Sequence, residues 1–203
     1  MSELEQRLAG AVPRTRLDNE RLARALRHRA ASEGLLDVAY ATLDTPLGEL
    51  LVAVTPRGVV RVAYPGPGED VVLEELAARV SPRVLRAPER TDELRRQLEE
   101  YFARRRRSFE VPVDWSLIRG FARGVLEATA AVPFGSVTTY RDVAAAAGSP
   151  RAYRAAGNAL GANPVPIVVP CHRVLHSGGE LGGYAGGLDR KRMLLTLEGV
   201  LPG

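Results

Sequence analysis

The chain has 203 residues, of which 45% are hydrophobic and 26% charged, a composition typical of a globular protein with one large domain or two small ones. No apolar run approaches the roughly 20 residues that span a bilayer, so we expect no membrane partner. The net charge of +4 lies mostly in residues 113–203, where nine Lys and Arg stand against six Asp and Glu, and this mild excess is compatible with a nucleic acid partner without requiring one.

The first segment, MSELEQRLAG, is polar and lacks the apolar stretch of a secretory signal, so we expect a cytoplasmic protein. Residues 17–34 have the pattern of an amphipathic helix that Asp18 or Asn19 can cap and Gly34 can end. Three strand-like runs follow, separated by Pro- and Gly-containing turn signals: Leu36–Thr42, Glu49–Val54 and Val59–Tyr64. Turns this short join neighbouring strands, which predicts an antiparallel meander.

Two helices come next in the predicted order, Glu69–Val80 and Thr91–Arg106. Residues 109–115 have the pattern of a partly extended connector. Beyond it the pattern is helical and rich in loops, with one strand at Pro166–Val169 and a last helix at Asp189–Leu197. We expect that last helix to bury Met193, Leu194 and Leu197.

The change of pattern near residue 113 divides the chain. We predict an α/β (α+β) protein with an N-terminal helical extension (1–35), a small α/β domain (36–112) and a mostly helical domain (113–203).

A pair of short helices is predicted after residue 138. Thr139 can cap the first helix with Asp142 at the third position, and Gly148 can end it. Ser149 can cap the second helix with Pro150 at its first position, and so tight a turn predicts a helix-turn-helix. The second helix is rich in Ala and Gly, so its backbone can approach a neighbouring helix or a DNA groove.

Arg154 is the long charged side chain of this second helix. It can probe a base stack or make a surface ion pair, and the residue pattern leaves both open.

The chain has one cysteine, Cys171, which excludes an intramolecular disulfide and a thiolate-rich metal site; we expect no metal and no cofactor. Composition alone favours an inert, buried thiol. The sequence around it points the other way, because an apolar run and a proline place the thiol at the end of a predicted strand. A reactive thiol needs a base, and His172 and Glu198 are candidates, although each also has a purely structural interpretation.

Several segments resemble the O6-alkylguanine-DNA alkyltransferases, also called methylated-DNA–protein-cysteine methyltransferases. The motif PCHRV carries the resemblance together with the upstream NPVPIVV and RAAGNALGANP and the downstream GGYAGGLDRKRMLLTLEG. It covers residues 132–199 strongly and extends weakly back to residue 36, and it overturns the expectation of an inert Cys171.

The resemblance implies an alkyl acceptor with its supporting residues. Cys171 would accept the alkyl group, with His172 as its base through a water, Glu198 holding the imidazole and Asn163 bracing the turn. Tyr140 would protonate the guanine as it leaves. The base pocket would be lined by Leu160, Val174, Tyr184 and Ala185.

The resemblance also implies the partner and the fold. The partner would be double-stranded DNA containing O6-alkylguanine, bound in the minor groove and flipped out of the stack, and O4-alkylthymine would be a second substrate. Arg154 would fill the place of the flipped nucleotide, and the residues expected to contact DNA besides it are Thr139, Tyr153, Gly157 and Ser177. The N-terminal domain would be ribonuclease H-like. Because the product thioether is stable, each molecule would act once. We also expect the protein to be a monomer in solution.

Three positions depart from the family pattern. Tyr153 is bulkier than expected, Gly161 leaves the recognition helix without a second basic residue, and LIRGF at residues 117–121 lacks the usual helix start. Three other readings remain. A non-enzymatic alkyltransferase-like protein would lack Cys171, a cysteine hydrolase would need no helix-turn-helix, and a regulator fused to an alkyltransferase would carry a cysteine-rich zinc module.

Overall fold

The computed structural model describes residues 21–25, 29, 33–66 and 68–202, and the chain divides into two compact units, residues 1–37 and residues 38–203. In the first unit, residues 21–25 and Arg29 are helical, as predicted for residues 17–34, and Gly34 follows with a left-handed φ of 66°. Glu33 and Gly34 form a turn, and residues 17–20, 26–28 and 30–32 of that predicted helix lie outside the described residues.

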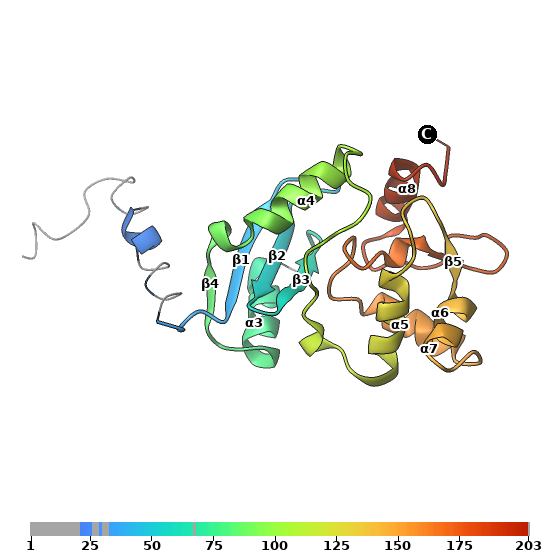
Figure 1. Ribbon diagram of the computed structural model, residues 1–203, viewed down its shortest axis with the longest axis horizontal. Helices are drawn as coiled ribbons and strands as arrows, with labels where there is room; N and C mark the ends of the chain where they lie inside the picture. The colour runs from blue at the N-terminus through green and yellow to red at the C-terminus, as the bar shows by residue number, and fades with distance from the viewer. Residues whose placement is uncertain (1–20, 26–28, 30–32, 67, 203) are drawn as a thin grey trace, which may run out of the picture. The chain divides into compact units, whose positions relative to one another are not determined.

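A four-stranded sheet in the order β3-β2-β1-β4 forms the first half of the second unit (Figure 1). The predicted antiparallel meander is confirmed by β1 (Val38–Leu43), β2 (Leu50–Thr55) and β3 (Gly58–Ala63). The fourth strand, β4 (Val84–Arg86), pairs in parallel with β1 and escapes prediction, because three residues are too few to show an alternating pattern.

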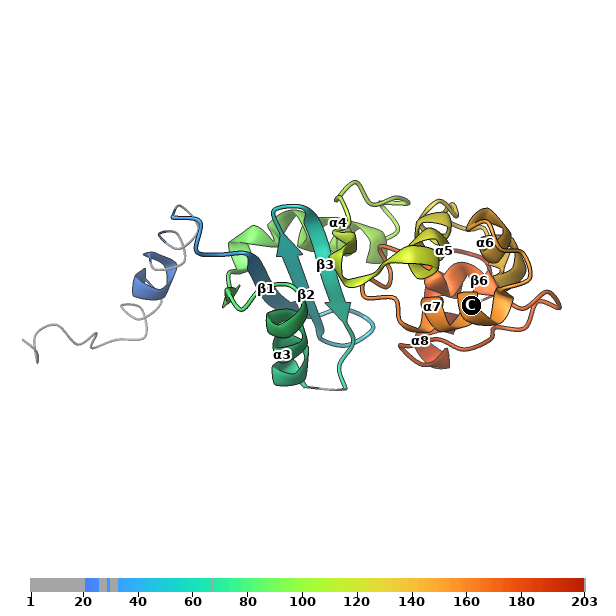
Figure 2. The same cartoon turned by 90° about the horizontal axis from the view of Figure 1, so that it is seen from below.

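Helices cover both faces of this sheet, since successive side chains of a strand point to opposite faces. Leu51 of β2 packs in one cluster with Leu76 of α3 (Glu69–Arg79). Val52, the next residue, packs in the other cluster with Leu98 of α4 (Asp92–Phe102). Figure 2 shows the two helices on opposite sides of the sheet.

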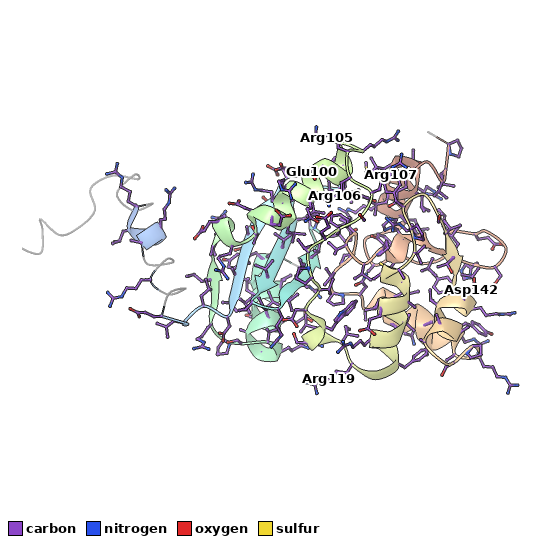
Figure 3. All side chains as sticks on the ribbon, in the orientation of Figure 1. Glu100, Arg105, Arg106, Arg107, Arg119 and Asp142 are labelled. Atoms are coloured by element: carbon purple, nitrogen blue, oxygen red, sulfur yellow. The ribbon has the colours of Figure 1, made fainter. Side chains whose placement is uncertain are left out.

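Helix α4 ends four residues earlier than predicted. The backbone of Arg104 has a left-handed φ of 58°, and the amide of Arg105 turns back to the Glu100 carbonyl at 2.8 Å. The side chain of Arg106 also folds back onto Glu100, with its Nε 2.8 Å from Glu100 Oε2. Arg105 and Arg107 lie on the same loop, next to Arg106 (Figure 3). These contacts stop the helix where its apolar pattern has run out.

Residues 109–115 form a connector, as predicted, and its Val113 is bridged to Val59 of β3. A Cβ on Gly58 would lie 2.1 Å from the Pro112 carbonyl oxygen, so only glycine allows this close approach. The short 3-10 helix η2 (Trp115–Leu117) follows, and its first turn is capped by Asp114.

The second half of the unit is mostly helical, as predicted. Its elements are α5 (Gly120–Ala130), β5 (Thr138–Thr139), α6 (Tyr140–Ala146), α7 (Tyr153–Gly161), the 3-10 helix η3 (Cys171–Arg173), β6 (Val174–Leu175) and α8 (Leu188–Leu197). Helices α5, α6 and α7 pack together around Leu126, Val143 and Ala156. The predicted α/β class is thus confirmed.

The predicted helix pair forms, with one correction. Thr139 and Asp142 make the capping box of α6, and Gly148 follows that helix with a φ of 83°. However, α7 begins at Tyr153 rather than after Ser149. Ser149 instead starts a separate turn, in which its carbonyl accepts from the Ala152 amide at 2.8 Å.

The predicted strand at Pro166–Val169 is wrong. This run is a buried turn in which Ile167 has a left-handed φ of 75° and the Val169 amide donates to the Val165 carbonyl at 2.9 Å. Pro166 and Pro170 have no amide hydrogen to give to a neighbouring strand. Its apolar side chains pack into the hydrophobic core with those of α5, α6 and α7, which is why the run resembles a buried strand in sequence.

Helix α8 begins one residue earlier than predicted and buries Leu194 as predicted, but Leu197 is only half-buried. Met193 is 48% exposed, while Lys191, Leu194 and Leu195 are buried. The apolar pattern misleads because a lysine occupies a core position. In the part of the chain that the structure describes, no helix is both long and apolar enough to cross a membrane.

Candidate functional site

Cys171 lies at the first position of η3, below a pocket of about 750 Å³. The side chain is only 4% exposed, and Asn163 Nδ2 donates to its Sγ at 3.1 Å. Burial raises the pKa of the Cys171 thiol to about 11, although Asn163 and the positive charge of Lys191 act in the opposite direction. The thiol is therefore protonated at neutral pH.

Asn163 holds the turn that presents this thiol. Its Oδ1 accepts from the Val165 amide at 3.0 Å, and its Nδ2 also donates to the Val169 carbonyl at 2.9 Å. One side chain thus joins both ends of the turn to the sulfur. This is the bracing position that the family resemblance implied for Asn163.

Glu198, at the C-terminal end of α8, lies behind the pocket in a dense set of donors. Arg173 donates through Nε to Oε2 at 2.9 Å and through Nη2 to Oε1 at 2.8 Å, and the Tyr101 hydroxyl donates to Oε1 at 2.6 Å. Burial alone would raise the pKa of Glu198, but the hydrogen bonds from His172, Arg173 and Tyr101 lower it to about 2. Glu198 is therefore a carboxylate at neutral pH.

The ionised Glu198 sets the proton position on His172. His172 Nε2 lies 2.9 Å from Glu198 Oε1, so Nε2 carries the hydrogen and donates it. Burial lowers the pKa of His172 despite the neighbouring carboxylate, which leaves the ring neutral. Among the described residues Nδ1 has no hydrogen-bond partner, so its lone pair is available to accept a proton.

Tyr140, the first residue of α6, lines the same pocket as Cys171. Its ring lies 5.1 Å from the His176 ring and packs over Gly157 of α7, where a Cβ would lie 3.8 Å from the tyrosine ring. Burial, together with the negative charge that Cys171 can carry, raises the pKa of Tyr140. Its hydroxyl therefore retains a proton that it can donate.

The outer edge of the pocket is formed by the start of α7. Tyr153 is 43% exposed, and the Arg154 guanidinium lies 5.9 Å from the centre of its ring. Arg154 is exposed, and the described residues give it no ion pair. A cation held this way is available to a partner.

The loop between β6 and α8 closes the other side of the pocket. Lys191 is completely buried, and its Nζ donates to the carbonyls of Val174 at 2.8 Å, of Leu181, and of Gly183 at 3.5 Å. A compact ammonium can reach three carbonyls that a planar guanidinium could not satisfy together. The loop is therefore fastened to α8 from within.

The structure brings most of the predicted site residues together. The pocket is lined by Tyr140, Tyr153, Arg154, Gly157, Leu160, Cys171, Ser177, Tyr184 and Ala185. Asn163, His172 and Glu198 lie behind it. Thr139 and Val174 do not line it: Thr139 caps α6, and Val174 is buried in β6 with its carbonyl bonded to Lys191.

Sequence reasoning did not assign three buried residues that support the site: Tyr101, Arg173 and Lys191. Arg173 follows His172 in an otherwise apolar run, which is a sign of a buried charge that needs a partner. Lys191 is the one lysine in a chain that otherwise uses arginine, and that exception marks a position where arginine does not fit. No local signal identifies Tyr101, because its partner Glu198 lies 97 residues away. The described residues contain no cluster of His, Cys, Asp and Glu that could hold a metal ion.

Comparisons with known proteins match nearly all of residues 38–203. Residues 38–115 match the family described as 6-O-methylguanine DNA methyltransferase, ribonuclease-like domain, and residues 120–200 match the DNA binding domain of the same description. A methylated-DNA–protein-cysteine methyltransferase of Methanosarcina barkeri is 35% identical over 159 residues, which are 78% of this chain and 96% of that protein. The human protein of that name is 37% identical over 169 residues, covering 80% of this chain and 81% of that protein.

A solved structure agrees with these matches. The structure of Mycobacterium tuberculosis OGT in complex with DNA is similar with a TM-score of 0.67 and 34% identity, covering 79% of this chain and 92% of that one.

Proposed function

The chain belongs to the methylated-DNA–protein-cysteine methyltransferase family, and we propose that it repairs DNA by transferring the alkyl group of O6-alkylguanine to Cys171, once per molecule. The observation that carries this proposal is the position of the thiol. Cys171 lies beneath a pocket that also contains Tyr140, and a neutral imidazole with a fixed tautomer lies beside it. We extend the proposal to O4-alkylthymine, whose alkylated oxygen has the same chemistry.

The reaction begins with removal of the thiol proton. His172 Nδ1 accepts it through a bridging water, since among the described residues this ring nitrogen has no direct hydrogen bond to Cys171. The imidazolium that forms is stabilised by the Glu198 carboxylate at 2.9 Å. Glu198 itself stays ionised, because its pKa is held at about 2.

The thiolate then attacks the alkyl carbon. A sulfur–carbon bond forms, the carbon–O6 bond breaks, and the electron pair moves into the purine. Tyr140 donates its hydroxyl proton to the purine, which makes guanine a better leaving group. The tyrosine then takes up the proton that His172 had received from the thiol. In sum, the thiol proton ends on guanine and the alkyl group ends on sulfur. Water does not cleave a thioether, so the acceptor is not regenerated.

The alkylated base must leave the helix to reach this pocket, because O6 lies at the pairing edge. We propose that α7 enters the minor groove, where its Ala- and Gly-rich surface permits close approach, and that Arg154 takes the place of the flipped nucleotide. Exposed Arg141, in the first turn of α6, and exposed Arg151, between α6 and α7, would contact phosphates. Thr139, Tyr153, Gly157 and Ser177 complete the proposed contact surface. A monomeric state and a cytoplasmic location stay predictions.

The experiment incubates the protein with duplexes that carry a radiolabelled methyl group on O6 of guanine or O4 of thymine. We expect label on the protein from both duplexes, more slowly with thymine, and none on a Cys171→Ala variant that still binds the guanine duplex. Label on the variant, or transfer from single-stranded DNA without any transfer from the duplex, would refute the proposed function. Transfer from the guanine duplex but not from the thymine duplex would remove O4-alkylthymine from it.

A further inference from the structure

A tyrosine of the ribonuclease-like domain contacts the active-site loop. Tyr64 directly follows β3, and its hydroxyl lies 2.6 Å from the hydroxyl of Tyr184, which is 120 residues away in sequence. The two rings meet edge to face, with centres 6.0 Å apart and planes at 63°. Burial raises the pKa of both hydroxyls, so both are neutral and one donates to the other.

Arg190 of α8 reinforces this contact. Its guanidinium lies 5.1 Å from the centre of the Tyr64 ring. Its Nε donates to the Leu47 carbonyl at 2.9 Å, and its Nη1 donates to the Gly186 carbonyl at 2.9 Å. One side chain thereby joins the turn between β1 and β2, the Tyr64 ring and the loop that carries Tyr184.

Gly186 provides the space for the pair. A Cβ at this position would lie 2.6 Å from Tyr64 Cε2 and 2.8 Å from Tyr184 Cε1, distances that no real side chain tolerates. The two rings therefore occupy the volume that any other residue at 186 would need. Tyr64 and Gly186 fit each other, although they come from different halves of the unit.

The contact matters because Tyr184 is part of the reaction pocket. Tyr184 lines the pocket with Cys171, and its ring meets the His172 ring edge to face with centres 6.5 Å apart. A shift of the Tyr184 ring would change the space beside the thiol. Among the described residues, the hydroxyl of Tyr184 is hydrogen-bonded to Tyr64 alone.

We propose that Tyr64 is a positioning residue for alkyl transfer: through its hydrogen bond to Tyr184 it fixes the pocket wall beside Cys171 and limits the size of the alkyl group that fits. The inference rests on the proposed function and deepens it. It gives the ribonuclease-like domain a part in selecting the substrate. Without the hydrogen bond, the Tyr184 ring moves more freely, so a methylated base is held less well and a bulky group is admitted more easily.

The test compares Tyr64→Phe with the wild type and with Tyr40→Phe. The control removes another tyrosine hydroxyl of the same domain, one that donates to the exposed Glu69, and Tyr40 packs in the core cluster of α3 rather than in that of Tyr64 and Tyr184. Single-turnover rates are measured on duplexes with O6-methylguanine and O6-benzylguanine, together with the affinity for the methylated duplex.

We expect Tyr64→Phe to slow methyl transfer about threefold to tenfold, as for the loss of one buried hydrogen bond, with affinity changed less than about twofold. The ratio of benzyl to methyl rates should rise, and Tyr40→Phe should match the wild type. Tyr184→Phe should lower the methyl rate equally, and the double variant should lose no more than either single variant. Unchanged rates, or an equal loss on both substrates, would overturn the proposal.

A second measurement does not depend on transfer. Fluorotyrosine placed at position 184 reports ring motion by fluorine NMR, and we expect faster ring flipping in Tyr64→Phe than in the wild type or in Tyr40→Phe. Equal flipping in all three would overturn the positioning role. A wild-type protein that transferred nothing would instead overturn the proposed function, so the two failures are distinguishable.

Discussion

Replacing Glu198 with glutamine tests the buried charge network behind the reactive cysteine. The pKa of Glu198 is about 2 in the folded protein, against an ordinary value of 4.5. At about 1.36 kcal/mol per pKa unit, the ionised carboxylate stabilises the fold by roughly 3 kcal/mol. Because Glu198 is only 5% exposed, solvent screens this contribution little.

The pH dependence of this effect has a definite sign. A carboxylate with a lowered folded pKa contributes its full stability above the unfolded value near 4.5, and the contribution is lost as the pH falls towards 2. Glutamine resembles the protonated acid in shape and charge. We therefore expect Glu198→Gln to destabilise the protein by roughly 3 kcal/mol at pH 7 and by much less near pH 2.5.

Urea unfolding at a series of pH values, followed by the fluorescence of the single tryptophan Trp115, measures this difference. Other carboxylates titrate equally in both proteins, so the difference between them isolates Glu198. Glu127→Gln is the control, since it removes an exposed ion pair with Arg123 and should cost less than about 1 kcal/mol. A loss below about 1 kcal/mol for Glu198→Gln at pH 7, or one that is independent of pH, would refute the network.

Three further predictions concern the reaction pocket. The rate at which iodoacetamide alkylates Cys171 should rise with pH until about 11, the raised pKa of the buried thiol, while circular dichroism confirms that the protein stays folded. A rate that levels off near the ordinary pKa of a thiol would show that the thiol is not desolvated. Tyr140→Phe should slow methyl transfer about a hundredfold or more with unchanged affinity for the methylated duplex, as expected for loss of a general acid in rapid-quench assays; a rate within about threefold of wild type would remove Tyr140 from that role. Arg154→Ala should slow transfer from duplex DNA at least about tenfold without changing the iodoacetamide rate, and an unaffected duplex rate would contradict the assignment of Arg154 to base flipping.

Local signals in the sequence predicted the elements whose causes are local. The turn signals at residues 45–48 and 56–58 predicted the antiparallel meander, and the Thr139 and Asp142 pair predicted the cap of α6. Both depend on residues only a few positions apart. The grouping of Asn163, His172 and Glu198 with Cys171 came instead from the resemblance to a known family, and the structure brings these side chains together.

Features that depend on distant partners could not be predicted in this way. The run at Pro166–Val169 is an exception with a local cause, since it has the apolar character of a strand but its prolines and the nearby side chain of Asn163 make it a turn. Lys191 occupies a core position of α8 because it donates hydrogen bonds to the carbonyl of Val174 in β6 and to those of Leu181 and Gly183 in the loop that follows, while Met193 lies at the surface. Sequence periodicity carries no information about such partners.

The supporting residues of the site illustrate the same limit. Tyr101 and Glu198, which are joined by a hydrogen bond, come from different halves of the unit. The hydrogen-bonded pair Tyr64 and Tyr184 does so too. An aromatic residue on an apolar helix face or at a strand end predicts burial, not the polar partner of its hydroxyl. The part that the ribonuclease-like domain plays in the site emerges only from the folded chain.

The most direct test of the central claim is mass spectrometry of the protein after incubation with an excess of duplex containing O6-methylguanine. The account predicts that each protein molecule gains one methyl group, that the gain maps to Cys171 in the digested protein, and that repaired DNA equals protein in amount. Repair that exceeds the amount of protein, or complete repair with Cys171 unmodified, would contradict it.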